Sequence, residues 1–314
     1  MLLTSALGCD RAKEASKTEA KTETSAKAKA KDATADESKA KGEAKTEIVL
    51  HRPFKVGDEY AFEGSGRDDK VRTVLVGGET VEGSTESFTV ALKADAIVHE
   101  VNAEGQPTRT EFKVRSCTPV DDPSVTLLDE GDVFMVLATD EPGGGNIVFP
   151  PGIGGPDMVE HMELLITTNF GPTDDELYGT KGAVSVGDSW SINRKEAAAE
   201  LSSGSNTATP DQVKGEMTFK GTEDVDGEAC QRFSSEMTVT DMDMGTLPPG
   251  TKADSVVLTA KQDRVLPVDS SKHSRGGSQE FSLKMVLQMP TESGQMQTVK
   301  MERTSKATIK LSPK

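Results

Sequence analysis

The feature that most limits what this chain can fold into is an alternation of apolar and polar residues between positions 281 and 311. Apolar side chains of one parity stand on both sides of a turn at 292–294: Phe281, Leu283, Met285, Leu287 and Met289 before it, then Val299, Met301, Ala307, Ile309 and Leu311. A period of two places alternate side chains on one face of a strand. The stretch therefore predicts a β-hairpin with one apolar face.

Similar but shorter patterns occur through most of the chain. They predict strands over 71–76, 87–101, 108–114, 125–128 and 133–138, then around 217–219, 233–239, 256–260 and 264–268. Residues 157–166 have helical spacing, with Asp157 as a possible cap, and 194–201 form a second helix candidate. Residues 142–156 contain six Gly and four Pro and are expected to be irregular. We predict a mainly β fold whose antiparallel sheets form a sandwich or an open half-barrel, with one or two short helices.

One short motif appears twice. Val56-Gly57-Asp58 precedes an aromatic strand start, and Val186-Gly187-Asp188 does the same 130 residues later. This suggests two related β-rich halves, 48–180 and 181–314. The alternative is that Gly-Asp before an aromatic residue is simply a common entry from a turn into a strand.

The segment 10–47 has a different composition from the rest of the chain. It holds ten Ala, ten Lys or Arg, nine Asp or Glu, eight Ser or Thr and one Gly, with no other apolar residue. Such a segment has no apolar surface to bury and cannot offset its conformational entropy. We expect a disordered tether.

The tether follows Ala6-Leu7-Gly8-Cys9. These four residues resemble the lipobox of bacterial lipoproteins, in which small residues precede a cysteine that carries the lipid. The resemblance implies that Cys9 is the lipid attachment site, that 1–9 is the end of a signal peptide, and that the true start codon lies upstream. It places the protein in a bacterial cell envelope, held on a membrane through the lipid at Cys9.

Charge argues against several partners. The body from 48 onward carries 26 Lys or Arg and 43 Asp or Glu. An acidic body repels nucleic acid and anionic lipid head groups, so we expect no nucleic-acid partner. A protein partner or a small apolar ligand stays open.

Two cysteines remain beyond Cys9. Cys117 and Cys230 are both out of phase with the apolar residues of their strands, which predicts that they point away from the core. In an oxidising compartment they could form a disulfide, and the alternative is two free thiols.

No catalytic or metal-binding pattern is convincing. Gly187-Asp188-Ser189 resembles the nucleophile motif of a serine-esterase family, but it lies mid-chain, and Asp269 and His273 have the wrong spacing for its partners. The four histidines are scattered, and we expect no metal and no cofactor. We therefore expect a lipid-anchored protein that acts by binding or as a structural envelope component, and not an enzyme. The alternatives are a carrier with an apolar β-barrel cavity, which the methionine-rich strands would suit, and a hydrolase.

Overall fold

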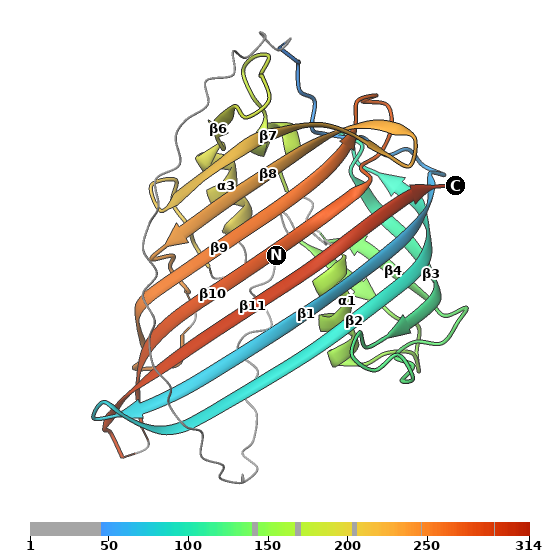
Figure 1. Cartoon of the computed structure of the whole chain (residues 1–314). Helices are drawn as coiled ribbons and strands as arrows, with labels where there is room; N and C mark the ends of the chain where they lie inside the picture. The colour runs from blue at the N-terminus through green and yellow to red at the C-terminus, as the bar shows by residue number, and fades with distance from the viewer. Residues whose placement is uncertain (1–44, 140–143, 167–170, 203–205, 246, 292) are drawn as a thin grey trace, which may run out of the picture.

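The computed structural model describes residues 45–139, 144–166, 171–202, 206–245, 247–291 and 293–314. Within these residues the chain is mainly β, with eleven antiparallel strands in one open sheet and three short helices (Figure 1). The sheet curls around the helices, which lie behind it in this view. The prediction of a mainly β fold in the form of an open half-barrel is confirmed.

The elements follow one another along the chain in this order: β1 (Glu59–Val76), β2 (Glu79–Val101), β3 (Pro107–Thr118), β4 (Val133–Ala138), β5 (Gly145–Val148), α1 (Pro156–Leu165), α2 (Asp174–Tyr178), β6 (Ser189–Ser191), α3 (Arg194–Leu201), β7 (Val213–Val225), β8 (Glu228–Thr240), β9 (Lys252–Pro267), β10 (Gly276–Pro290) and β11 (Met296–Pro313).

The two ends of the β region meet in the middle of the sheet. The strand order is β5-β4-β3-β2-β1-β11-β10-β9-β8-β7-β6, so β1 pairs with β11 and every other neighbour is consecutive in the chain. The β1–β11 ladder runs from Tyr60 opposite Pro313 to Val76 opposite Gln297. This pairing joins the two predicted halves in one sheet, and their division at 180 stays a prediction.

All three helices contribute to packing on one face of the sheet, which we call the inner face. Helix α1 approaches β1 closely because Gly64 and Gly66 present no side chain there. A Cβ at Gly66 would lie 2.8 Å from Leu164 Cδ2, and one at Gly64 would lie 3.3 Å from Leu165 Cδ1. A larger residue at either position would push α1 away from the strands.

The inner face carries two main apolar clusters. One lies under α1 and contains the large buried side chains of β1 to β4, among them Phe62, Phe112 and Phe134. The other lies under α2 and α3 and contains residues of β7 to β10, including Phe219 and Phe233. The sheet therefore has a packed core at each side.

Most sequence-based elements are confirmed. The closing hairpin is β10 and β11, and the two helix candidates are α1 and α3. Helix α1 begins after Gly155 with Pro156 in its first turn, so the proposed cap at Asp157 is wrong by two residues. Proline suits this position because its missing N–H would be unbonded there anyway.

Two local predictions are corrected. Residues 125–128 are not a strand. They form a bend that makes one isolated bridge, between Leu128 and Cys117. The stretch 142–156, expected to be irregular, contains strand β5, and its residues 142–143 lie outside the described part of the chain. The one glycine of β5, Gly145, does not prevent pairing because β5 is a four-residue edge strand.

The repeated Val-Gly-Asp motif forms the same turn twice. Asp58 Oδ2 accepts a hydrogen bond from Lys55 N at 2.7 Å, and Asp188 Oδ2 accepts one from Ser185 N at 2.8 Å. The glycines at the two turns have φ of 90° and 87°, in the left-handed region that favours Gly. In each turn the glycine N–H then donates to the carbonyl of a residue on a neighbouring strand, which is Val98 for the first turn and Phe219 for the second. The N–H of that same residue donates back to the carbonyl of the motif's aspartate. The motif is a turn-to-strand entry with a defined geometry.

Cys117 and Cys230 are free thiols, which is the alternative to a disulfide that the sequence left open. Both are buried, at 1% and 0% exposure, so the prediction that they point away from the core is wrong. They belong to β3 and β8, which five other strands separate in the sheet. A register shift between Lys93 and Ala94 in the β2–β3 ladder changes the phase of the pairing, and it accompanies the inward position of Cys117 in the first core.

The lipid-attachment residue Cys9 and tether residues 10–44 lie outside the described part of the chain. Among the described residues, no helix is long and apolar enough to cross a membrane.

Candidate functional site: a groove on the inner face

Between the two apolar clusters the inner face holds a groove of about 440 Å3, which we call the inner groove. Its floor is made by two cross-strand rows. In one row Ile309, Gly277 and Arg264 stand side by side on β11, β10 and β9. In the next row Gln279 and Gln262 face each other across β10 and β9. The floor therefore has a glycine at its centre and polar side chains towards β9.

Two consecutive glycines keep this floor open. A Cβ at Gly276 would lie 2.0 Å from the carbonyl oxygen of Ile309, and one at Gly277 would lie 1.9 Å from that of Asp263. Gly276 also has a φ of 109°, which other residues rarely adopt. Glycine is thus required at both positions because the backbones of β9 and β11 lie so close to β10 there.

The walls of the groove combine apolar side chains from both cores with polar ones such as Gln106 and Thr110. The first core contributes Tyr60, Phe112, Val136 and Ile166, and the second contributes Leu50, Leu177, Tyr178 and Leu266. Side chains from 50 to 311 thus converge on one hollow, although their own strands lie in different parts of the sheet.

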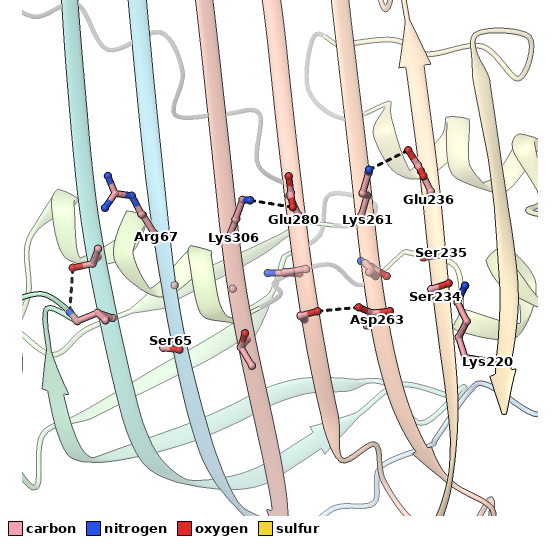
Figure 2. A pocket seen from close by; sticks show the side chains of 18 of the residues that line it. Ser65, Arg67, Lys220, Ser234, Ser235, Glu236, Lys261, Asp263, Glu280 and Lys306 are labelled. Carbon is pink, nitrogen blue, oxygen red and sulfur yellow. Dashed lines mark hydrogen bonds and ion pairs between the residues drawn. The ribbon is translucent and has the colours of Figure 1, made fainter. Parts of the chain in front are cut away.

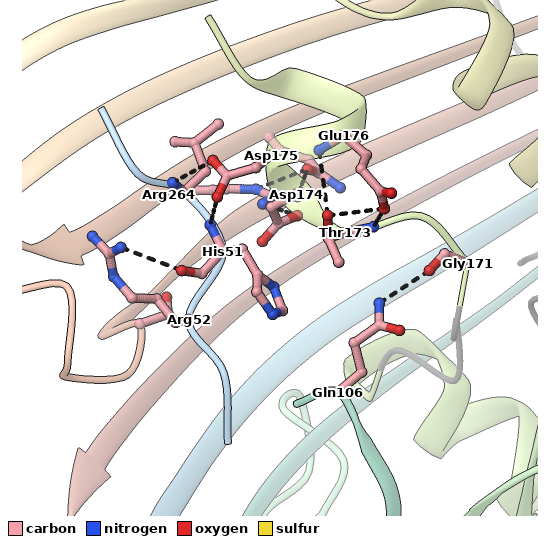
Figure 3. A network of polar contacts seen from close by, with 12 residues as sticks. His51, Arg52, Gln106, Gly171, Thr173, Asp174, Asp175, Glu176 and Arg264 are labelled. Carbon is pink, nitrogen blue, oxygen red and sulfur yellow. Dashed lines mark hydrogen bonds and ion pairs between the residues drawn. The ribbon is translucent and has the colours of Figure 1, made fainter. Parts of the chain in front are cut away.

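One wall is held by a polar network around α2 (Figure 3). Arg264 reaches from β9 to form an ion pair with Asp174 at the start of α2, and its guanidinium lies 4.9 Å from the centre of the Tyr178 ring. The same guanidinium donates to Gln262 Oε1 at 2.9 Å. Arg264 is therefore bonded to other side chains of this chain, and its role is to fix α2 over the floor of the groove.

The carboxylate of Asp174 stabilises the charged form of Arg264. Burial alone would lower the pKa of Arg264, but the carboxylate of Asp174 more than offsets it, so the pKa is raised above its usual range. Burial raises the pKa of Tyr178 to about 12, which keeps its hydroxyl neutral at any physiological pH. Arg264 is a stable cation and Tyr178 a neutral ring.

A segment that we call the strap, residues 45–58, crosses the mouth of the groove. Its Leu50 and His51 N–H groups donate to the Asp175 carboxylate, at 2.8 and 3.2 Å. Further along, Phe54 N donates to the Gly105 carbonyl at 2.8 Å. The strap thus connects α2 on one side with the β2–β3 turn on the other.

At its far end the strap is fastened to the β9–β10 loop. His273 Nε2 lies 2.9 Å from Asp58 Oδ2, and the His273 ring stacks on Phe54 with centroids 4.1 Å apart. The strap is therefore bonded to both cores of the half-barrel.

A larger hollow of about 770 Å3 lies on the outer face of the sheet (Figure 2). It is lined by charges that pair across neighbouring strands, with Lys306 Nζ 3.3 Å from Glu280 and Lys261 Nζ 3.5 Å from Glu236. Short hydroxyl residues such as Ser65, Thr308 and Ser278 form the adjacent row. These side chains already satisfy one another or face water, so this hollow is a weaker candidate for a ligand.

The residues considered for a hydrolase are engaged elsewhere. Ser189 Oγ is hydrogen bonded to Thr218 Oγ1 at 2.7 Å on an exposed edge strand. Asp269 Oδ1 accepts from Ser271, and His273 is paired with Asp58. The Cys117 and Cys230 thiols do not line the inner groove.

The sequence reasoning missed the residues that make the groove. Arg52, Arg264 and the Gly276-Gly277 pair were not singled out. The glycine pair could have been found, because two glycines directly before an alternating strand signal a close approach of backbones. The two arginines gave no local signal.

Fold and groove together define an open half-barrel with a hollow between two cores. No protein-family model matches this chain, and no curated protein does. Among solved structures, one of lipid–protein interactions in lipovitellin is similar over 82% of this chain and 25% of that chain, with 8% identity and a TM-score of 0.36. An outer membrane channel from Pseudomonas putida F1 is similar over 85% of this chain and 100% of that chain, with 7% identity and a TM-score of 0.19. The chain spans about a quarter of the length of the lipovitellin chain that it matches.

Proposed function

We propose that this protein binds a small ligand with an apolar body in the inner groove, and that it acts as a binding protein or carrier and not as a catalyst. The observation that carries the proposal is the groove itself, which opens between two packed cores over a floor whose centre, at Gly276 and Gly277, carries no side chain. Its volume of about 440 Å3 lies within the range of small-molecule sites. Protein cores are otherwise packed without such voids.

The apolar part of the lining suits an extended apolar chain. Aromatic and aliphatic side chains from both cores supply the walls, and burial of each methylene against them contributes about 0.8 kcal/mol. An alkyl ligand should therefore bind about fourfold more tightly for each added CH2 until the groove is full. This dependence on chain length separates insertion into the groove from adsorption on the surface.

The test uses a neutral dye and a matched pair of variants. Nile red should bind the 314-residue chain with increased fluorescence, and alkyl ligands should displace it. Ile309 and Thr308 are neighbours on β11 whose side chains lie on the inner and outer faces, so Ile309→Trp fills the groove and Thr308→Trp does not. We expect Ile309→Trp to lose binding and Thr308→Trp to keep it. Equal binding by both variants would contradict the site.

The sequence further supports a lipid anchor at Cys9, and we propose that it holds this binding protein on a membrane of a bacterial envelope. A lipoprotein modification supplies at least two acyl chains, whereas one chain binds membranes only marginally. Expressed in a bacterium with a full signal peptide fused ahead of Ala6-Leu7-Gly8-Cys9, the protein should incorporate labelled fatty acid and partition into detergent. Cys9→Ser should abolish both, and recovery of unmodified protein with Met1 intact would overturn the anchor.

A further inference from the structure

Arg52 is a buried charge that lines the inner groove. It belongs to the strap and is 7% exposed. Its guanidinium donates to the carbonyl oxygens of Val49 at 2.6 Å, His51 at 3.4 Å and Pro267 at 3.1 Å. All three acceptors are neutral backbone groups.

No counterion accompanies this guanidinium among the described residues. No carboxylate oxygen lies within 4.0 Å of it there, and its Nε has no hydrogen-bond acceptor. Asp175, Asp269 and Asp174 act on it only through longer-range attraction. Asp175 and Asp174 are themselves bonded to the strap and to Arg264. Arg52 thus differs from Arg264, which shares the groove but has its own carboxylate.

Burying a guanidinium without a counterion costs free energy unless another group supplies the missing negative charge. A buried cation without a partner charge loses its hydration and gains little in return, which is why buried charges in proteins are paired. Burial accordingly lowers the pKa of Arg52, although an arginine stays charged at any physiological pH. Of its five donors, three are used by backbone carbonyls, and those that remain are the Nε–H and one hydrogen on Nη2.

We propose that the ligand of the inner groove is an amphiphile with an acidic head group, a carboxylate or a phosphate, and that Arg52 binds this head while the apolar chain lies over the Gly276-Gly277 floor. The inference rests on the proposed function and names its ligand class. Two unused guanidinium donors suit an anion with two oxygens, and such charge-assisted bonds are about twice as strong as neutral ones. The head group supplies the missing counterion.

The test compares head groups on one chain length. Dodecanoate, dodecyl phosphate and dodecan-1-ol, each below its micelle concentration, displace Nile red from the 314-residue chain. The two anions should bind at least about tenfold more tightly than the alcohol. Whichever anion is preferred identifies the acid. Equal affinity for all three would overturn the inference and leave the proposed function standing, whereas failure of all three would refute the proposed function itself.

Variants locate the preference at Arg52. Arg52→Met keeps the unbranched apolar stem of the side chain and removes the charge, and it should bring the two anions to the affinity of the alcohol without weakening the alcohol. Arg67→Met is the matched control, because Arg67 is exposed on β1 and paired with Asp69 outside the groove. Circular dichroism confirms that each variant is folded. Should Arg52→Met fail to fold, the head-group comparison on the unaltered protein still decides the inference. A preference for anions that survives in folded Arg52→Met would contradict the role of Arg52.

Discussion

Arg303 Nε lies 2.8 Å from Asp68 Oδ1, between two residues that are 235 positions apart in the chain and both buried. The pair joins β11 to β1 at the centre of the sheet. Arg303 Nη2 also lies 3.0 Å from Glu160 Oε1, and Lys70 Nζ lies 2.6 Å from the same oxygen. Helix α1 is therefore tied to the strand pair by charge as well as by packing.

We expect Arg303→Met to lower the free energy of unfolding by about 3–5 kcal/mol, because it leaves the Asp68 carboxylate buried without its partner charge. Urea unfolding measures the change. Lys306→Met, on the exposed outer face of the same strand, should cost less than about 1 kcal/mol. The double variant Asp68→Leu with Arg303→Met should recover part of the loss. A loss below 1 kcal/mol in the single variant would show that the pair is not buried as described.

We expect Gly277→Ala to destabilise the protein by at least about 2 kcal/mol and to weaken Nile red binding. Its Cβ would overlap the Asp263 carbonyl oxygen, so β9 and β10 must separate and the floor of the groove must shift. Gly83→Ala is the control, since a Cβ there meets nothing closer than 3.8 Å. Thermal unfolding and dye titration check both. Unchanged stability in Gly277→Ala would contradict the close approach.

The Cys117 thiol predicts a specific response to alkaline pH. Burial raises its pKa from 9.0 to about 12, so the folded state holds the proton after the unfolded state has lost it. The stability contributed by the neutral thiol is therefore complete below about pH 9 and is lost as the pH rises towards 12. From pH 9 upwards, the wild type should lose up to about 1.4 kcal/mol per pH unit more than Cys117→Ala. Urea unfolding at pH 8, 9 and 10 measures this, and parallel curves would contradict it.

The two Val-Gly-Asp turns allow a comparison within one molecule. Asp58→Ala and Asp188→Ala each remove a hydrogen bond from a carboxylate to a backbone N–H, worth about 1–2 kcal/mol. Asp58→Ala also removes the contact with His273 and should cost more. Adding His273→Gln should then cost little in the Asp58→Ala background and more in Asp188→Ala. Equal costs in both backgrounds would show that the His273 contact does not stabilise the strap.

The sequence predicts the strands well where one face of a strand is buried and the other is exposed to solvent. The closing hairpin has that pattern over much of its length, and β10 and β11 follow it. It predicts poorly where a short element depends on its neighbours. Helix α2 has only five residues and was missed, although Thr173 and Glu176 form a capping box that is visible in the sequence.

The candidate site could not be predicted from local patterns. The burial of Arg52 depends on β9 passing beneath the strap, and the partner of Arg264 lies on a helix that was missed. Cys117 was assigned to the wrong face because a register shift in its ladder has no signature in its own strand. The pairing of β1 with β11 likewise depends on contacts far apart in the chain, to which a period of two gives no clue.

The pairing of β1 with β11 also determines when the sheet can be completed during protein synthesis. As the chain leaves the ribosome, β1 and β2 emerge first and can pair, but one edge of β1 has no neighbour until β11 has been synthesised. Contacts so distant in sequence close slowly, and an unpaired central strand is prone to associate with other chains meanwhile. Completion of this half-barrel therefore waits for the last strand of the sheet, and the nascent form that lacks β11 is the one in most need of a chaperone.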